Sequence, residues 1–124
     1  MIRVNVGGMS AKEVANLILE HGQGQFQVKI GSDIEGAKGV AAGEADYYFG
    51  ACATGGGGAL SMAIAILGYQ KCFTASMPGK QPKQEDINKA VKEGKKAFGF
   101  TQDHIKTVVP MIIKAILLKQ SLEG

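Results

Sequence analysis

A cysteine, a threonine and four consecutive glycines stand together near the middle of this 124-residue chain, in the run from Cys52 through Thr54 to Gly58. Ordering four glycines in a row costs a large backbone entropy, so we expect them where backbone N–H groups closely approach a bound group. An apolar run that favours a strand precedes this loop, and an apolar run that favours a helix follows it. Since helix N-termini bind anions and polar oxygens, we predict a ligand site at the loop.

Cys52 and Thr54 are the candidate catalytic residues of the loop. The positive end of the helix dipole favours a thiolate, so Cys52 could act as a base or a nucleophile, with the Thr54 hydroxyl as a donor beside it. The ligand-binding N–H groups would come from Gly55, Gly56, Gly57 and Gly58. These parts suit proton abstraction next to a carbonyl, or transfer through a covalent cysteine. The alternative is a buried apolar Cys52, with glycines that let the helix pack against a sheet.

Apolar runs that favour strands alternate with helical patterns along the whole chain. The strands are expected at residues 2–6, 26–30, 46–51, 71–75 and 97–100, each followed by a helix. This alternation predicts a single α/β domain over residues 1–124, with three α/β/α layers around a mostly parallel five-stranded sheet. The expected fold is Rossmann-like or flavodoxin-like.

Capping residues mark where three of the expected helices begin. Ser10 and Glu13 have the spacing of a capping box, and Ser32 and Glu35 have the same spacing. Thr101 is expected to cap the last helix, which Pro110 should kink because proline donates no hydrogen bond.

Two helices are more apolar than one buried face requires. The run 59–67 is apolar on every side, which predicts a helix buried all round. The apolar stretch 108–113 in the last helix suggests a surface for self-association, so we expect a homo-oligomer.

Other residues that could reach the same ligand follow the remaining strands, because parallel strands collect their exit loops at one edge of the sheet. The further ligand-binding candidates are Gly7, Gly8, Ser32, Asp33 and Lys80. Asp33 could instead supply charge to the first turn of its helix, and Lys80 could be a solvated side chain. His104 could reach this edge as a neutral acid–base group or lie at the surface, while Cys72 is expected to be structural, in a central strand.

The composition excludes several classes of protein. The hydrophobic fraction of 45% and the charged fraction of 20% are typical of a globular protein. The net charge of +3 comes with scattered lysines, without the basic stripe of a nucleic-acid binder. The apolar runs are too short to span a bilayer and the chain begins with a strand, so we expect a cytoplasmic protein without membrane insertion. The two cysteines lack metal spacing, and we predict no metal and no cofactor.

Over nearly its whole length the chain resembles the YhfU family of short bacterial proteins of unknown function. The likeness is closest in Ala45-Asp-Tyr-Tyr-Phe-Gly-Ala-Cys-Ala-Thr-Gly-Gly-Gly-Gly-Ala-Leu-Ser-Met-Ala-Ile-Ala and in Ala97-Phe-Gly. This resemblance implies a setting in small-molecule metabolism and names no activity.

A local resemblance concerns the loop itself. The segment 40–46, Cys52-Ala-Thr-Gly and Ser61-Met-Ala-Ile-Ala are similar to a helix, strand and loop of B-type ribose-5-phosphate isomerases. In that family the cysteine moves the proton and the threonine, with loop amides, holds the enediolate oxygen; the resemblance gives these roles to Cys52 and Thr54. This chain lacks the family's Asp-His pair after the first strand and its arginine-rich phosphate clamp, and Ala53 replaces a loop glycine.

Two functional interpretations therefore stay open. The first is a protein that binds a small anionic or carbonyl metabolite at residues 52–58, with isomerase-like chemistry on a sugar phosphate through a cysteine base. The second is a non-catalytic binding or regulatory subunit, or a phosphocarrier similar to the B subunits of sugar phosphotransferase systems. In those subunits a cysteine and a glycine-bearing loop follow the first strand, whereas Cys52 follows the third.

Overall fold

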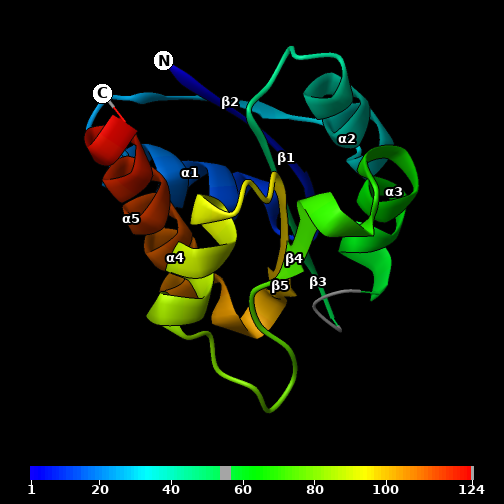
Figure 1. The fold of residues 1–124 in the computed structure, drawn as a ribbon. Helices are drawn as coiled ribbons and strands as arrows, with labels where there is room; N and C mark the ends of the chain where they lie inside the picture. Colours follow the sequence, from blue (N-terminus) through cyan, green and yellow to red (C-terminus); the bar gives the residue numbers. More distant parts are fainter. Residues whose placement is uncertain (54–56, 124) are drawn as a thin grey trace.

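The computed structural model describes residues 1–53 and 57–123, in which strands and helices alternate as the sequence predicts (Figure 1). The strands are β1 (Ile2–Gly8), β2 (Phe26–Ile30), β3 (Tyr47–Cys52), β4 (Cys72–Thr74) and β5 (Ala97–Thr101). The helices are α1 (Ala11–His21), α2 (Asp33–Ala41), α3 (Gly57–Leu67), α4 (Gln84–Lys92) and α5 (Ile105–Glu123). Short 3₁₀ turns at Tyr69–Lys71 and Gln102–His104 lead into β4 and α5.

The strands form one parallel sheet in the order β2-β1-β3-β5-β4. The α/β fold class is thereby confirmed. The order β2-β1-β3 is that of flavodoxin-like sheets, and β5 then lies between β3 and β4. The chain leaves β1 toward one side of the sheet and leaves β3 toward the other, so the topological switch point lies between β1 and β3. Because β4 is an edge strand, the central position predicted for Cys72 is wrong, although Cys72 is buried.

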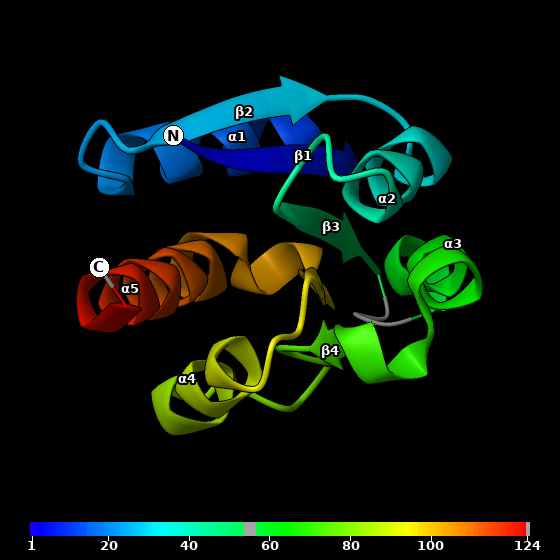
Figure 2. The same ribbon diagram turned by 45° about the horizontal axis from the view of Figure 1, so that its top comes forward.

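Helices cover both faces of the sheet, as Figures 1 and 2 show. Helix α1 connects β1 to β2 and α4 connects β4 to β5; both connections run toward the β2 edge of the sheet, and both helices lie on one face. Helix α2 connects β2 to β3 and α3 connects β3 to β4; these connections run toward the β4 edge, and their helices lie on the opposite face. This is the arrangement that right-handed crossovers produce. Helix α5 packs between α1 and α4, and α2 packs against α3.

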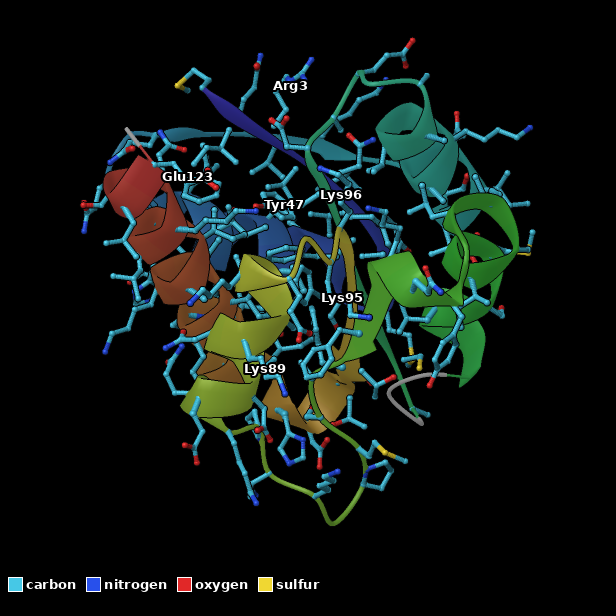
Figure 3. All side chains as sticks on the ribbon, in the orientation of Figure 1. Arg3, Tyr47, Lys89, Lys95, Lys96 and Glu123 are labelled. Carbon is cyan, nitrogen blue, oxygen red and sulfur yellow. The ribbon has the colours of Figure 1, made fainter. Side chains whose placement is uncertain are left out.

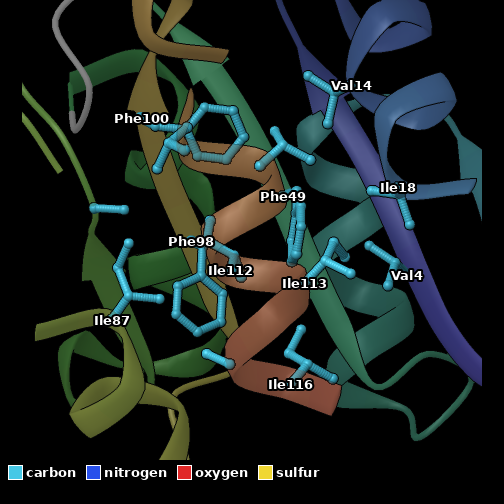
Figure 4. Close-up of a cluster of buried hydrophobic side chains, with 14 of the residues drawn as sticks. Val4, Val14, Ile18, Phe49, Ile87, Phe98, Phe100, Ile112, Ile113 and Ile116 are labelled. Atoms are coloured by element: carbon cyan, nitrogen blue, oxygen red, sulfur yellow. The ribbon is translucent and has the colours of Figure 1, made fainter. Parts of the chain in front are cut away.

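The main core lies between the sheet and the layer formed by α1, α4 and α5 (Figure 4). Phe49 packs edge-on against Phe98 and Phe100, with ring centroids 5.9 and 6.3 Å apart. Ile112 and Ile113 of α5 are fully buried beneath these rings. Alternation along β3 sends Tyr48 to the opposite face, into a smaller cluster with α2 and α3.

The apolar stretch at residues 108–113 of α5 was expected to form a surface for self-association, and its burial shows that this expectation is wrong. Val108, Val109, Ile112 and Ile113 are buried because α5 is the middle helix of its layer. This stretch is therefore core, and it does not supply the exposed surface that the sequence suggested. Self-association stays a prediction without that support.

Helix α3 is not buried all round, contrary to the sequence-based expectation. Of its described side chains, Leu60 and Ala63 are buried, whereas Ser61 and Ala65 are exposed and Ile66 is partly exposed. The reason is its position: α3 lies on one face of the sheet with α2 as its helical neighbour, so part of its circumference faces outward.

Of the predicted caps, the one at Ser32 is confirmed: Ser32 Oγ accepts from Glu35 N–H at 3.0 Å, and the Glu35 carboxylate accepts from Ser32 N–H at 3.3 Å. The capping box predicted at Ser10 is wrong, because Ser10 has a left-handed φ of 55° and its hydroxyl accepts from Gln102 Nε2 at 2.7 Å. Thr101 makes no side-chain cap either, since its hydroxyl bonds to His104. Helix α5 continues through Pro110.

The helices within residues 1–53 and 57–123 include none with the length and apolar character that crossing a membrane requires.

Candidate functional site

The carboxyl ends of β1 and β3 lie side by side at the switch point. Gly7 pairs with Gly50 and Gly8 with Ala51, and the N–H of Met9 donates to Ala51 O at 2.8 Å. A side chain at Gly8 would lie 2.4 Å from Ala51 O on a backbone with a φ of +76°, so glycine is required there. We call the ends of these two strands, with Gly7, Gly8, Tyr48 and Cys52, the switch-point edge. In doubly wound sheets this is where ligands bind.

Tyr48 is the most unusual residue at the switch-point edge. Its side chain is fully buried, and its hydroxyl has no hydrogen-bond partner among the described residues. A Cβ on Gly7 would lie 2.8 Å from the Tyr48 hydroxyl, and one on Gly36 would lie 2.5 Å from the ring. Two glycines, one on β1 and one on α2, therefore make room for this tyrosine. A buried polar group without a partner costs about 1–3 kcal/mol, so its presence calls for a physical reason.

Electrostatics keep the Tyr48 hydroxyl protonated. Burial raises the pKa of Tyr48, and the negative charges of Asp33 and of the Cys52 thiolate raise it further. The hydroxyl is therefore a hydrogen-bond donor at any physiological pH. The charge interactions also place it near the start of α2 and near Cys52.

Cys52 ends β3 beside the first turn of α3. It is 8% exposed and forms no disulfide, and a Cβ on Gly58 would lie 3.8 Å from its own Cβ. The first turn of α3 carries no acidic residue, so no carboxylate there opposes the positive end of the helix dipole. Gly57 and Gly58 begin this helix.

The predicted roles of Thr54, Gly55 and Gly56 lie outside the described residues.

Three further residues were predicted to bind the ligand, and they lie on two different elements: Ser32 and Asp33 at α2, and Lys80 after β4. Ser32 and Asp33 lie at the start of α2, near Tyr48, but both cap their own helix: Asp33 Oδ1 accepts from Ile34 N–H at 2.9 Å. Lys80 lies on the turn after β4, where Met77 and Lys80 exchange backbone hydrogen bonds. In the sheet β5 lies between β4, which Lys80 follows, and β3.

A buried hydrogen-bonded chain next to Cys52 was largely missed by sequence reasoning. Thr101 Oγ1 lies 2.6 Å from His104 Nδ1 and 3.3 Å from Ser76 Oγ, and Ser76 Oγ accepts from Thr101 N–H at 3.1 Å. All three side chains are buried, and Thr101 pairs with Cys52 in the register of β3 and β5. The sequence signal for this chain is a threonine at a strand exit with His104 three residues later.

A cavity of about 310 Å³ lies at the opposite end of the sheet, around Met1, Tyr47, Lys96 and Glu123 (Figure 3). Burial raises the pKa of Tyr47, and nearby carboxylates add to the rise. These residues lie at the amino ends of the strands, where doubly wound sheets rarely bind their ligands. We therefore place the candidate site at the switch-point edge. Within the described residues, no group of three His, Cys, Asp or Glu side chains could hold a metal ion.

The fold and this edge define a parallel α/β protein with a glycine-lined switch point. A family model described as "Protein of unknown function DUF2620" matches residues 2–116, and the chain belongs to this family. "Uncharacterized protein YhfU" of Escherichia coli K12 is 42% identical over 113 residues, which cover 91% of this chain and 97% of that protein. Proteins of the same name from Escherichia coli O6:H1 and Shigella flexneri match equally well. The predicted resemblance to the YhfU family is thus confirmed.

Proposed function

We propose that this protein binds a small anionic or carbonyl-containing metabolite at the switch-point edge. The observation that carries the proposal is the Tyr48 hydroxyl, which is buried beside Gly7 and near Cys52 without a partner among the described residues. A ligand oxygen that accepts a hydrogen bond from this hydroxyl would remove the penalty of its burial. Ligand binding would then explain the presence of a tyrosine at this buried position.

The charges at the starts of α2 and α3 support α3 as the helix that would receive the anionic part of the ligand. The first turn of α2 carries Asp33 and Glu35, and two of its N–H groups already donate to side chains. The first turn of α3 has no acidic residue and follows the glycine loop. Helix N-termini attract negative charge, so the anionic part of the ligand is assigned to α3.

The proposed chemistry is a proton transfer of the isomerase type, on a sugar phosphate or a related carbonyl compound. The Cys52 thiolate would take a proton from the carbon next to a carbonyl group, and the carbonyl oxygen would gain the negative charge. A hydrogen bond from Tyr48 would stabilise that oxygen. The hydroxyl proton on the carbon that was deprotonated would move to the negatively charged oxygen, and the cysteine would return its proton to the former carbonyl carbon, which completes the isomerisation and restores the thiolate.

Calorimetric titration with inorganic phosphate and with ribose 5-phosphate tests the binding. The wild-type protein is expected to bind at least one of them, and Tyr48→Phe should weaken that binding by about tenfold, the value of one lost hydrogen bond. Tyr47→Phe is the matched control, since it removes a hydroxyl from the neighbouring residue of β3 on the other side of the sheet. Equal affinity in Tyr48→Phe and wild type would contradict the proposal.

A non-catalytic binding or regulatory role is the second candidate. It is favoured by the positions of two cations, because Lys80 lies beyond β4 and Arg3 pairs with Asp46 at the other end of the sheet. NMR of ribose 5-phosphate in deuterated buffer separates the two roles. Uptake of deuterium next to the carbonyl, lost in Cys52→Ser, supports the enzyme; binding without uptake supports the binding subunit. A phosphoryl group stable on Cys52 would instead indicate a phosphocarrier.

A further inference from the structure

We infer that a groove between α4 and α5 binds an amphipathic helix of another protein, one whose apolar face is bordered by acidic side chains. The groove has a volume of about 500 Å³, and the residues that line it include Lys89, Lys92, Ala115, Leu118, Lys119 and Leu122. We call it the α4–α5 groove; its two helices lie side by side in Figures 1 and 2. The inference goes beyond the proposed function and does not depend on it, because α4 and α5 cover the face of the sheet opposite to the one that Tyr48 faces.

A strip of apolar side chains on α5 forms the floor of the groove. Ala115, Leu118 and Leu122 follow one another at intervals of three and four residues, so they share one face of the helix. Ala115 is buried, whereas Leu118 is 49% exposed and Leu122 is 79% exposed. Adjacent apolar side chains that face water beside a hollow, with a polar border, are typical of a surface that binds another protein.

Cationic side chains from both helices border this strip. Lys89 and Lys92 belong to α4, where Figure 3 shows Lys89, and Lys119 belongs to α5. None of these three lysines forms a hydrogen bond or an ion pair with another described residue. Among the described residues of the lining, the one carboxylate is that of Glu123. The groove is therefore apolar along its floor and positively charged at its border.

An amphipathic helix with acidic flanks complements both properties. Its apolar side chains would pack on Leu118 and Leu122, and carboxylates next to them would lie opposite the lysines of α4 and α5. Helices commonly bind proteins in this way, with apolar residues at helical spacing set into an apolar groove.

Charge and shape disfavour two other occupants. A second copy of this chain, seated on the same surface about a two-fold axis, would place lysines opposite lysines. A lipid bilayer takes up helices that present an apolar face outward along their length. In α5 most of the apolar residues are buried in the core instead, and the exposed leucines line a hollow between two helices.

The test is the fluorescence anisotropy of a labelled synthetic peptide of about 18 residues, with leucines on one helical face and glutamates on both sides of that face. The wild-type protein is expected to bind it, and added NaCl should weaken the binding by screening the exposed charges. Leu118→Glu should weaken binding by about tenfold or more, because it removes an apolar contact and sets a negative charge against the glutamates. Leu19→Glu is the matched control, since Leu19 is 55% exposed on α1 and does not line the groove.

Charge reversal tests the border separately. Lys89→Glu combined with Lys92→Glu should weaken binding of the acidic peptide by about tenfold, and should strengthen binding of a peptide with lysines in place of its glutamates. Lys12→Glu combined with Lys38→Glu makes the same change of net charge on α1 and α2, and should leave both affinities near those of the wild type.

Several results would overturn the inference. One is a wild-type protein that does not bind the acidic peptide, and another is equal affinity in Leu118→Glu and wild type. A dimer that Leu118→Glu dissociates would assign the groove to a second copy, and binding to phosphatidylglycerol vesicles that Leu118→Glu abolishes would assign it to a membrane. Binding of ribose 5-phosphate should be the same in Leu118→Glu as in the wild type, so the failure of this inference and that of the proposed function are distinguishable.

Discussion

Folding and ligand binding make opposite demands on Tyr48. Its ring fills the space between β3 and α2, while its hydroxyl lies buried without a partner among the described residues. A phenylalanine would keep the packing and avoid the polar penalty. The hydroxyl is therefore a cost to the folded protein that a bound ligand oxygen would offset.

The first prediction follows from this conflict. Tyr48→Phe should leave the free energy of unfolding unchanged or raise it by about 1 kcal/mol, because it removes a buried unpaired hydroxyl without altering the ring. Urea denaturation of both proteins without ligand measures the difference. A loss of about 2 kcal/mol or more would show that the hydroxyl is already satisfied in the folded chain, and would contradict our interpretation of the site.

At the scale of elements, the close packing of α2 on the sheet positions Tyr48. Gly36 and Gly39 face β3 and β1: a Cβ on Gly36 would lie 2.5 Å from the Tyr48 ring, and one on Gly39 would lie 2.6 Å from Asn5 Nδ2. Asn5 in turn donates to Gly36 O at 3.2 Å. Helix α2 can therefore pack this closely against β1 and β3 because Gly36 and Gly39 have no side chains.

The second prediction tests this packing. Gly36→Ala should destabilise the protein by about 1–3 kcal/mol, since the methyl group collides with a buried ring that cannot move aside easily. It should also weaken binding of ribose 5-phosphate by displacing Tyr48. Gly31→Ala is the matched control, because a Cβ there meets only a Glu35 side-chain oxygen at 3.5 Å. Similar stabilities of Gly36→Ala and Gly31→Ala would show that α2 can shift at little cost.

At the scale of the whole molecule, the end of the sheet opposite the site is held by Arg3 and Asp46. Burial alone would raise the pKa of Asp46, but hydrogen bonds from the Arg3 backbone and guanidinium and the charges of Arg3 and Lys96 hold it below its usual value. An acid with a lowered pKa in the folded state stabilises the protein above its unfolded pKa, near 4. That contribution is lost as the pH falls through the folded value.

The third prediction is the pH dependence of this pair. Asp46→Asn should destabilise the protein by about 0.5 kcal/mol at pH 7, because both side chains are roughly 40% exposed and the ion pair is screened. The difference from wild type should shrink below pH 4 as Asp46 becomes protonated. Chemical denaturation at several pH values measures it, with Glu44→Gln as the control for loss of one negative charge. A difference independent of pH would contradict the assigned ion pair.

The fourth prediction concerns assembly. We expect self-association, so light scattering should give a mass above that of one chain. The buried stretch at residues 108–113 does not supply the contact, and α3, with no charged side chain in its sequence, has partly exposed apolar residues. A strictly monomeric protein would contradict this expectation.

Much of this molecule could be predicted from its sequence. Strand and helix patterns predicted the parallel α/β sheet, and the capping box at Ser32 marked where α2 begins. The insertion of β5 between β3 and β4 could not be predicted, because local periodicity carries no information on strand order. For the same reason the pairing of Cys52 with Thr101 was missed, and so was the burial of Tyr48 between glycines of different elements.

The central claim is that a ligand oxygen bonds to Tyr48 at the switch-point edge, and amide chemical shifts test it most directly. In ¹⁵N–¹H spectra, ribose 5-phosphate should shift the amides of Gly7, Gly8, Cys52 and Gly58, and these shifts should be strongly reduced in Tyr48→Phe but not in Tyr47→Phe. Shifts confined to the opposite end, around Tyr47 and Lys96, or shifts of equal size in Tyr48→Phe, would contradict it.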